Sequence, residues 1–125
     1  MDYKVVAKHI PGKPELPKKH YATIVRPKNV TLDILSNRIA EISPVNQLDT
    51  QTVLVAFTKV LPEFLKQGAT VELGDLGRLM VNISSGGADT EEDFTDVQIK
   101  SNKISYQPSV KVKEVMKAVK YEKIK

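Results

Sequence analysis

The residues best suited to chemistry in this sequence are lysines, and the chemistry they offer is the binding of anionic groups. Lys113, Lys117 and Lys120 follow one another at spacings of four and three residues near the C-terminal end. On a helix, that spacing places all three side chains on one face. Ammonium groups gathered in this way can contact phosphates. A lysine face that is simply solvated has the same pattern, so the spacing leaves both interpretations open.

Lys100 and Lys103 are the next candidates for phosphate contact, because they lie on a predicted strand. They are three residues apart, and side chains alternate along a strand, so the two point to opposite faces. At most one of them faces any given groove, and the alternative is an ordinary charge at a solvated sheet edge. Lys18 and Lys19 also have two possible interpretations. They extend a positive surface, or they discourage pairing of an exposed strand edge.

No arrangement of residues indicates catalysis. The chain has no cysteine, and it has no Ser/His/Asp arrangement, no phosphate-binding loop and no pair of carboxylates typical of a cleft. Gly86-Gly87 lacks the Lys-Ser/Thr that a phosphate loop needs. His9 and His20 have no carboxylate pattern around them, which favours polar surface residues over a metal pair. We therefore expect no enzyme, no cofactor, no metal and no small-molecule substrate.

Charge is distributed unevenly along the chain, whose formal net charge is +4. Residues 1–28 carry seven basic and two acidic side chains, and residues 97–125 carry eight basic and two acidic. Residues 29–96 between them carry four basic and eleven acidic side chains. Basic ends favour a polyanionic partner, most often nucleic acid. The alternative is that lysines simply solubilise flexible ends.

The size and hydropathy of the chain predict one cytoplasmic domain. A length of 125 residues suits a single domain that buries its own core. No apolar run approaches the roughly 20 residues of a membrane span. The apolar stretch at the N-terminus is too short for a signal peptide. We therefore expect a cytoplasmic protein with no membrane partner.

Two helices are predicted in the first half of the chain. Thr31 is a good N-cap for the first, whose apolar face recurs at helical spacing and which ends at Ser43-Pro44. Asp49 is the predicted N-cap of the second, over about residues 50–67, with a wide apolar stripe typical of a central helix. Gly68 is a natural stop for that helix.

Strands are predicted on both sides of these helices. Thr70–Leu73 and Leu79–Ser84 flank a turn containing Gly74 and Gly77, two residues that tolerate positive φ. A third strand is predicted over Val97–Tyr106. Pro108 suits the first turn of a last, basic helix. Two shorter strands are predicted before the first helix, at Tyr3–Lys8 and His20–Val25. This order of elements belongs to the α+β class.

The order of these elements resembles the bacterial HU and integration-host-factor family of DNA-binding proteins. The resemblance rests on Leu73-Gly74-Asp75-Leu76-Gly77-Arg78-Leu79, on the long ribbon over Val81–Tyr106, and on Tyr106-Gln107-Pro108-Ser109 leading into the last helix. Lys18-Lys19-His20-Tyr21-Ala22 is similar to family members with an N-terminal extension. The resemblance implies an extension over residues 1–28, an HU-like domain over residues 29–120 with its arm at about 81–106, and a tail over residues 121–125.

The resemblance also implies a function. Two N-terminal helices would form the body of an intertwined homodimer, and a three-stranded sheet would extend into two arms that embrace the minor groove of duplex DNA. The protein would be an architectural, histone-like DNA-binding protein of the nucleoid with little sequence preference. Phosphate contacts are assigned to basic residues of the arm and the last helix: Arg78, Lys100, Lys103, Lys111, Lys113, Lys117 and Lys120.

The sequence departs from the family pattern in three places. The arm tip carries Asp89-Thr90-Glu91-Glu92-Asp93 and Asp96 instead of basic residues and an Asn-Pro wedge, and carboxylates repel phosphates. The aromatic residues of the family turn are replaced by Leu76 and Leu79, and the usual Pro-Gly-Lys before the last helix is Pro108-Ser109-Val110. In that last case, Lys111 is the substitute for the missing lysine.

The acidic tip leaves two further questions open. Phe94, the one aromatic residue of the arm, is a wedge into DNA or packs against protein. The arm as a whole binds DNA, or it belongs to an HU-fold protein-interaction module that has lost or weakened DNA binding.

Overall fold

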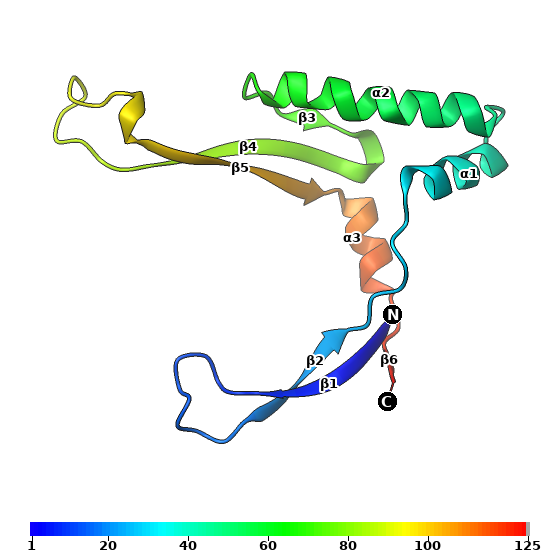
Figure 1. Cartoon of the computed structure of the whole chain (residues 1–125), viewed down its shortest axis with the longest axis horizontal. Helices are drawn as coiled ribbons and strands as arrows, with labels where there is room; N and C mark the ends of the chain where they lie inside the picture. Colours follow the sequence, from blue (N-terminus) through cyan, green and yellow to red (C-terminus); the bar gives the residue numbers. More distant parts are fainter. Residues whose placement is uncertain (125) are drawn as a thin grey trace. The chain divides into compact units, whose positions relative to one another are not determined.

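The structure is a computed structural model that describes residues 1–124, and it has the mixed α+β composition predicted from the sequence (Figure 1). It separates into two compact units. One contains Met1–Asn29 together with the residues from Val115 onward, and the other contains Val30–Glu114. The predicted division at residues 28 and 120 stays a prediction, and Lys125 of the predicted tail lies outside the described residues.

The elements are β1 (Asp2–Lys8), β2 (Lys19–Ile24), α1 (Leu32–Ile42), α2 (Gln47–Leu65), β3 (Val71–Glu72), the 3-10 turn η1 (Gly74–Leu76), β4 (Gly77–Ser85), the 3-10 turn η2 (Asp96–Gln98), β5 (Ile99–Pro108), α3 (Val110–Lys117) and β6 (Glu122–Lys123).

The first unit is built around a three-stranded sheet in the order β2-β1-β6, here called the N-terminal sheet. Strands β1 and β2 pair antiparallel from Tyr3 opposite Ile24 to Lys8 opposite Lys19, which confirms both predicted strands to within a residue or two. Strand β6 pairs with β1 in parallel. The sequence pattern does not predict β6, because a strand of two residues has no alternation to detect.

Helix α1 begins where its sequence predicts. The Thr31 hydroxyl oxygen accepts a hydrogen bond from Ile34 N at 3.4 Å, and Ser43 ends the helix. For α2, the prediction of Asp49 as N-cap is wrong, since the helix begins three residues earlier and its N-cap is Asn46. Asn46 Oδ1 accepts from Asp49 N at 2.8 Å, and Asn46 Nδ2 donates to Asp49 Oδ2 at 3.1 Å. Asp49 therefore lies in the first turn, where the helix dipole favours a carboxylate.

Helix α2 has few buried apolar side chains despite its apolar sequence. Its end agrees with the predicted stop, since the helix closes at Leu65 and Gly68 has φ of 80°. Within residues 1–124, Leu65 is the only apolar residue in the buried class. Val53, Phe57 and Phe64 remain 65%, 43% and 49% exposed. A chain of this length normally buries a larger core, so a wide apolar face of α2 remains uncovered.

The second sheet has the order β3-β4-β5, and β4 and β5 form a long two-stranded ribbon, here called the arm (Figure 1). The two strands pair antiparallel from Gly77 opposite Pro108 to Ser84 opposite Ser101. The pairing then shifts so that Ser85 lies opposite Ile99, which leaves Lys100 as the extra residue of a bulge.

Two predicted boundaries of this region are wrong. Val97 lies in the 3-10 turn Asp96–Gln98 rather than in the third strand, because Thr95 and Gln98 form a capping box there. Pro108 ends β5 and does not open the last helix, since its pairing with Gly77 extends the ribbon to that residue. Ser109 precedes α3 instead, and its hydroxyl oxygen accepts from Val112 N at 3.2 Å.

Candidate nucleic-acid interface

One face of the arm is polar, and the register of β4 and β5 determines which residues lie on it. Directly opposed residues of an antiparallel pair share a face. Arg78 lies opposite Gln107, and Asn82 lies opposite Lys103. The same face carries small polar side chains between and beyond these pairs. Its members, here called the polar ribbon face, are Arg78, Met80, Asn82, Ser84, Ser101, Lys103, Ser105 and Gln107.

The polar ribbon face brings two predicted phosphate contacts together. Arg78 and Lys103 lie on one face of the ribbon, four residues apart along the pairing, which corresponds to about 13 Å. Arg78 Nε donates to Gln107 Oε1 at 2.8 Å. This bond orients the guanidinium group while its terminal nitrogens keep their donors. Lysine, arginine, serine and amide side chains are the groups that contact phosphates in DNA complexes.

Sequence reasoning missed the uncharged members of this face. Asn82 Nδ2 donates to Ser105 Oγ at 3.4 Å across the two strands, and Gln107 holds Arg78. The signal was present as the alternation of Arg78, Met80, Asn82 and Ser84 along β4. A search restricted to charged residues does not detect such an alternation.

The opposite face of the arm is apolar and forms a groove with the end of α2. Leu79, Val81 and Ile83 of β4 lie opposite Tyr106, Ile104 and Asn102 of β5. A groove of about 520 Å³ is lined from this side by Val81, Ile83 and Ile104, and from α2 by Pro62 and Leu65. Ile83 is 65% exposed and Ile104 is 55% exposed, so the groove is open.

The base of the arm is fixed by the turn that contains Gly74 and Gly77. Both glycines have positive φ, of 60° and 127°, as the sequence predicts. A Cβ atom at Gly77 would lie 2.1 Å from the backbone oxygen of Gln107, so only glycine fits the close approach of the two strands. Tyr106 Oη donates to Leu76 O at 2.6 Å from the neighbouring strand.

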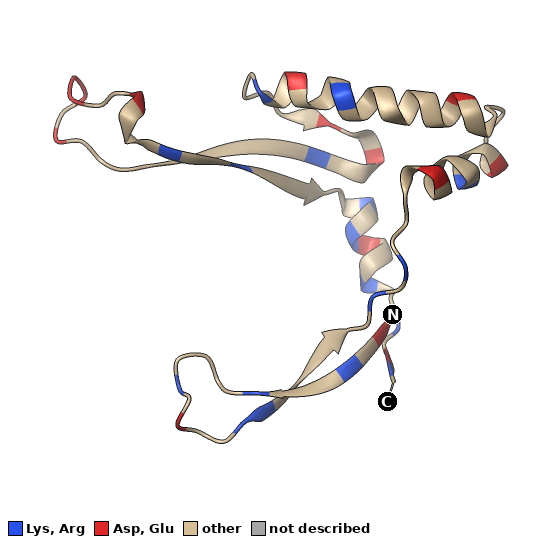
Figure 2. Ribbon diagram, in the orientation of Figure 1, with Lys and Arg blue, Asp and Glu red and all other residues tan. Residues whose placement is uncertain are grey.

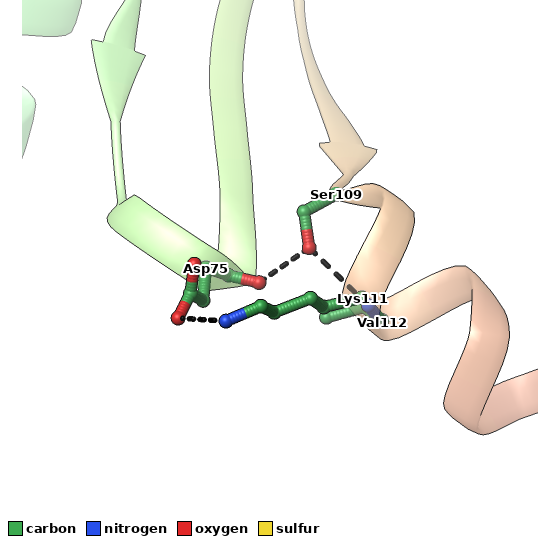
Figure 3. Close-up of polar contacts among 4 residues, drawn as sticks. All are labelled: Asp75, Ser109, Lys111 and Val112. Carbon is green, nitrogen blue, oxygen red and sulfur yellow. Dashed lines mark hydrogen bonds and ion pairs between the residues drawn. The ribbon is translucent and has the colours of Figure 1, made fainter.

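The same turn holds the start of α3, as Figure 3 shows. Ser109 Oγ donates to the backbone oxygen of Asp75. Lys111 Nζ lies 3.0 Å from Asp75 Oδ2 in an ion pair whose side chains are 72% and 80% exposed. Lys111, a predicted phosphate contact, is therefore neutralised by a neighbouring carboxylate. An exposed pair of this kind contributes about 0–1 kcal/mol, so it does not prevent Lys111 from changing partner.

The three lysines at the C-terminal end are only partly brought together. Lys113 and Lys117 lie four residues apart on α3, so they share a face as predicted. The prediction that Lys120 shares this face is wrong, because the helix ends at Lys117. The backbone oxygen of Lys120 accepts from the N-terminal amine of Met1 at 2.9 Å instead.

Acidic residues are concentrated at the far end of the arm, whereas lysines and arginines predominate in the first unit (Figure 2). The segment between β4 and β5 contains Asp89, Glu91, Glu92, Asp93 and Asp96 and no basic residue. Phe94 lies within this segment and is 40% exposed. Its assignment as a DNA wedge or as a packing residue stays a prediction.

Residues 1–124 contain neither a metal-binding cluster nor a membrane-spanning helix. No group of three or more His, Cys, Asp or Glu side chains in this part of the chain could hold a metal ion. No helix among the same residues is long and apolar enough to cross a membrane.

The helices, the glycine turn and the arm define a mixed α+β protein, and comparison of the sequence identifies its family. A family model described as an HU domain fused to a wHTH, Ig or glycine-rich motif matches residues 1–123. The chain belongs to this family, which confirms the resemblance to HU proteins. No curated protein sequence matches the chain.

A solved structure has the same fold. It is the crystal structure of a candidate bacterial DNA-binding protein from Bacteroides vulgatus ATCC 8482, with a TM-score of 0.61 and 16% sequence identity. The match covers 98% of this chain and 48% of that chain, so the chain spans about half the length of its structural neighbour. At this level of identity, the similarity concerns the fold alone.

Proposed function

We propose that this protein is an HU-like, nucleoid-associated architectural protein that binds duplex DNA as a homodimer with little sequence preference. Membership of an HU-domain family and the polar ribbon face support DNA binding. The neighbour from Bacteroides vulgatus, described as a candidate DNA-binding protein, supports the same partner. The observation that carries the proposal is that Arg78 and Lys103 share one face of the arm with several uncharged hydrogen-bonding side chains.

In this proposal the DNA backbone lies along the polar ribbon face and α3. Arg78, Lys103, Lys113 and Lys117 contact phosphates directly, and Lys111 joins them by exchanging Asp75 for a phosphate. Lys100 and Lys120 have weaker support, because one lies in a bulge and the other lies outside the helix. Phosphate contacts carry no sequence information, which accounts for the expected lack of sequence preference. The acidic arm tip stays away from the DNA because like charges repel.

The homodimer is supported by the apolar surface that one chain leaves uncovered. Phe57 and Phe64 of α2 remain about half exposed, and most of the side chains that line the groove between α2 and the arm are apolar. Burying one phenylalanine side chain contributes roughly 1.5–3 kcal/mol. A second copy that covers these residues completes the missing core. Phe64→Asp is expected to convert dimers to monomers in sedimentation equilibrium, whereas a wild type that is monomeric at every concentration contradicts the proposal.

Salt dependence of DNA binding tests the phosphate contacts. Each lost contact reduces the slope of log K against log salt by about 0.9. Because each substitution removes a contact from both subunits of the dimer, the double variant R78Q/K103Q should lose about 3.6 from this slope. The control R38Q/K59Q removes the same charge from α1 and α2 and should leave the slope unchanged. Fluorescence anisotropy with a labelled duplex of random sequence measures both. A wild type that does not bind at low salt refutes DNA binding.

A second candidate function is an HU-fold protein-interaction module. The observation in its favour is the acidic segment from Asp89 to Asp96, which lacks any basic residue. Its partner would be a basic protein surface contacted by the arm tip. This function is favoured if the wild type does not bind DNA and if neutralising Glu91, Glu92 and Asp93 abolishes capture of a basic protein such as a lysine-rich histone tail.

A further inference from the structure

Three lysines share one face of the N-terminal sheet, and the strand register identifies them. Lys8 lies directly opposite Lys19, and Lys4 lies opposite Thr23. Lys4 and Lys8 are four residues apart on β1, so their side chains point to the same side of the sheet. All three residues are exposed. We call this set the hairpin lysine face. Between its ends, Val6 lies opposite Tyr21, which is 38% exposed.

The two ends of this sheet face have opposite charge. At the end formed with β6, Asp2 pairs with Glu122, which places two carboxylates on the same side as the lysines. Beyond Lys8 and Lys19, at the other end, the loop adds Lys13 and Lys18 and only one acidic residue, Glu15. Positive charge is therefore concentrated toward the loop, and Figure 2 shows the blue segments of β1 and β2 there.

No acidic side chain within residues 1–124 forms an ion pair with these lysines. The ion pairs found in residues 1–124 join Arg38 to Glu41 and Lys111 to Asp75. Lys8 and Lys19 instead face each other across the strands, and like charges directly opposite are destabilising. An anion bound between the two ammonium groups would remove this repulsion. The face therefore fits an anionic partner with more than one charge.

We propose that the hairpin lysine face is a second DNA-binding surface, which contacts phosphates of duplex DNA independently of the arm. The proposal rests on the proposed function, because it assigns the same partner to a different part of the chain. Four residues of strand separate Lys4 from Lys8 by about 13 Å, close to the roughly 12 Å width of the major groove. Lys4 would contact one phosphate strand, and Lys8 and Lys19 the other.

Tyr21 lies between these lysines and has a matching role. Its side chain is on the same face as Val6, in the centre of the set. Because the lysines on either side of it contact opposite phosphate strands, the Tyr21 hydroxyl would lie over the groove, where it can donate a hydrogen bond to a base edge. The polar face of β1 and β2 thus presents cations at both sides of a neutral donor. The opposite face of the sheet, with Tyr3, Val5 and Ile24, has no comparable charge.

The test measures the salt slope of full-length protein on a labelled random duplex. The triple variant K4Q/K8Q/K19Q removes three contacts from each subunit of the dimer and should reduce the slope by about 5.4, at about 0.9 for each contact. The control K123Q lies on the other side of the sheet, since Lys123 pairs with Tyr3, and should leave the slope unchanged. The triple variant K4R/K8R/K19R keeps the charge and should keep the wild-type slope, which separates loss of charge from loss of folding.

The possible results separate this inference from the proposed function. If the triple glutamine variant keeps the full slope while R78Q/K103Q loses part of it, the inference is wrong and the proposed function stands. If the triple glutamine variant loses slope while R78Q/K103Q does not, the inference holds and the arm contacts are wrong. A wild type that binds phosphatidylserine vesicles through these lysines but does not bind DNA overturns both proposals. If the triple arginine variant loses as much slope as the triple glutamine variant, the inference alone is wrong.

Discussion

Among substitutions of glycine by alanine, Gly77→Ala is the one for which the structure predicts the largest loss of stability. Gly77 lies at the base of the arm with φ of 127° and ψ of −145°. This conformation is close to a region that only glycine readily adopts. The added Cβ would also lie 2.1 Å from Gln107 O and 3.0 Å from Pro108 Cα. Both neighbours are backbone atoms of β5, so no side-chain rotation relieves the contact.

The expected magnitude has two parts. The unfavourable backbone conformation costs about 1–3 kcal/mol for a residue with a side chain. Moving β5 away from β4 adds about 1–3 kcal/mol, which is typical of overpacked sites. The free energy of unfolding should therefore fall by roughly 2–6 kcal/mol, a large part of the total for a small domain. The corresponding fall in Tm is about 10–25 °C.

Thermal unfolding followed by circular dichroism measures this loss, with all variants at one protein concentration because association raises apparent stability. Two other glycines provide matched controls. Gly87 has ordinary φ and no atom within 4 Å of an added Cβ, so Gly87→Ala should have almost no effect. Gly74 has φ of 60° in open space, so Gly74→Ala should cost only about 1 kcal/mol.

The order of these three effects is the decisive result. If Gly77→Ala is no more destabilising than Gly74→Ala, backbone conformation alone explains both. The close approach of β4 and β5 would then not restrict this position, and the described base of the arm would be wrong.

Two smaller effects follow from polar contacts. Asn46→Ala removes the N-cap of α2 and should reduce the free energy of unfolding, measured with urea, by about 1 kcal/mol. An unchanged free energy would show that Asn46 does not cap the helix. Asp75→Asn removes the exposed ion pair to Lys111, so stability should change by less than about 1 kcal/mol. The same variant releases Lys111, and DNA affinity at low salt should rise; a fall in affinity would contradict a phosphate contact by Lys111.

The sequence predicts those parts of the fold that depend on local chemistry. Thr31 caps α1 as expected because a threonine before an apolar periodic segment satisfies the first free amide groups. The glycine turn is recognisable because Gly74 and Gly77 both need positive φ. The predicted N-cap of α2 is wrong because Asn46 and Asp49, three residues apart, are both residue types favoured at N-caps. Residue preference at the N-cap does not distinguish them.

The candidate site is less predictable because it depends on pairing between distant residues. Whether Arg78 and Lys103 share a face depends on the register of β4 and β5, and one residue of slippage would separate them. The bulge at Lys100 has the same origin. The end of α3 before Lys120 could not be predicted either, because the following residues run into β6 and pair with β1. The spacing of lysines in the sequence contains no information about these pairings.

The pairing of β6 with β1 has a consequence for the order in which the chain folds. Hairpin β1–β2 is local and can form once both strands have left the ribosome, whereas Glu122 must find Asp2 across nearly the whole chain. Closing so long a loop has an entropic penalty that only later contacts offset, and domains generally fold from the N-terminal side during synthesis. The first unit is therefore the first to begin folding and the last to finish. Until β6 arrives, the edge of β1 at Asp2 and Tyr3 stays unpaired, and an unpaired strand edge is open to mispairing.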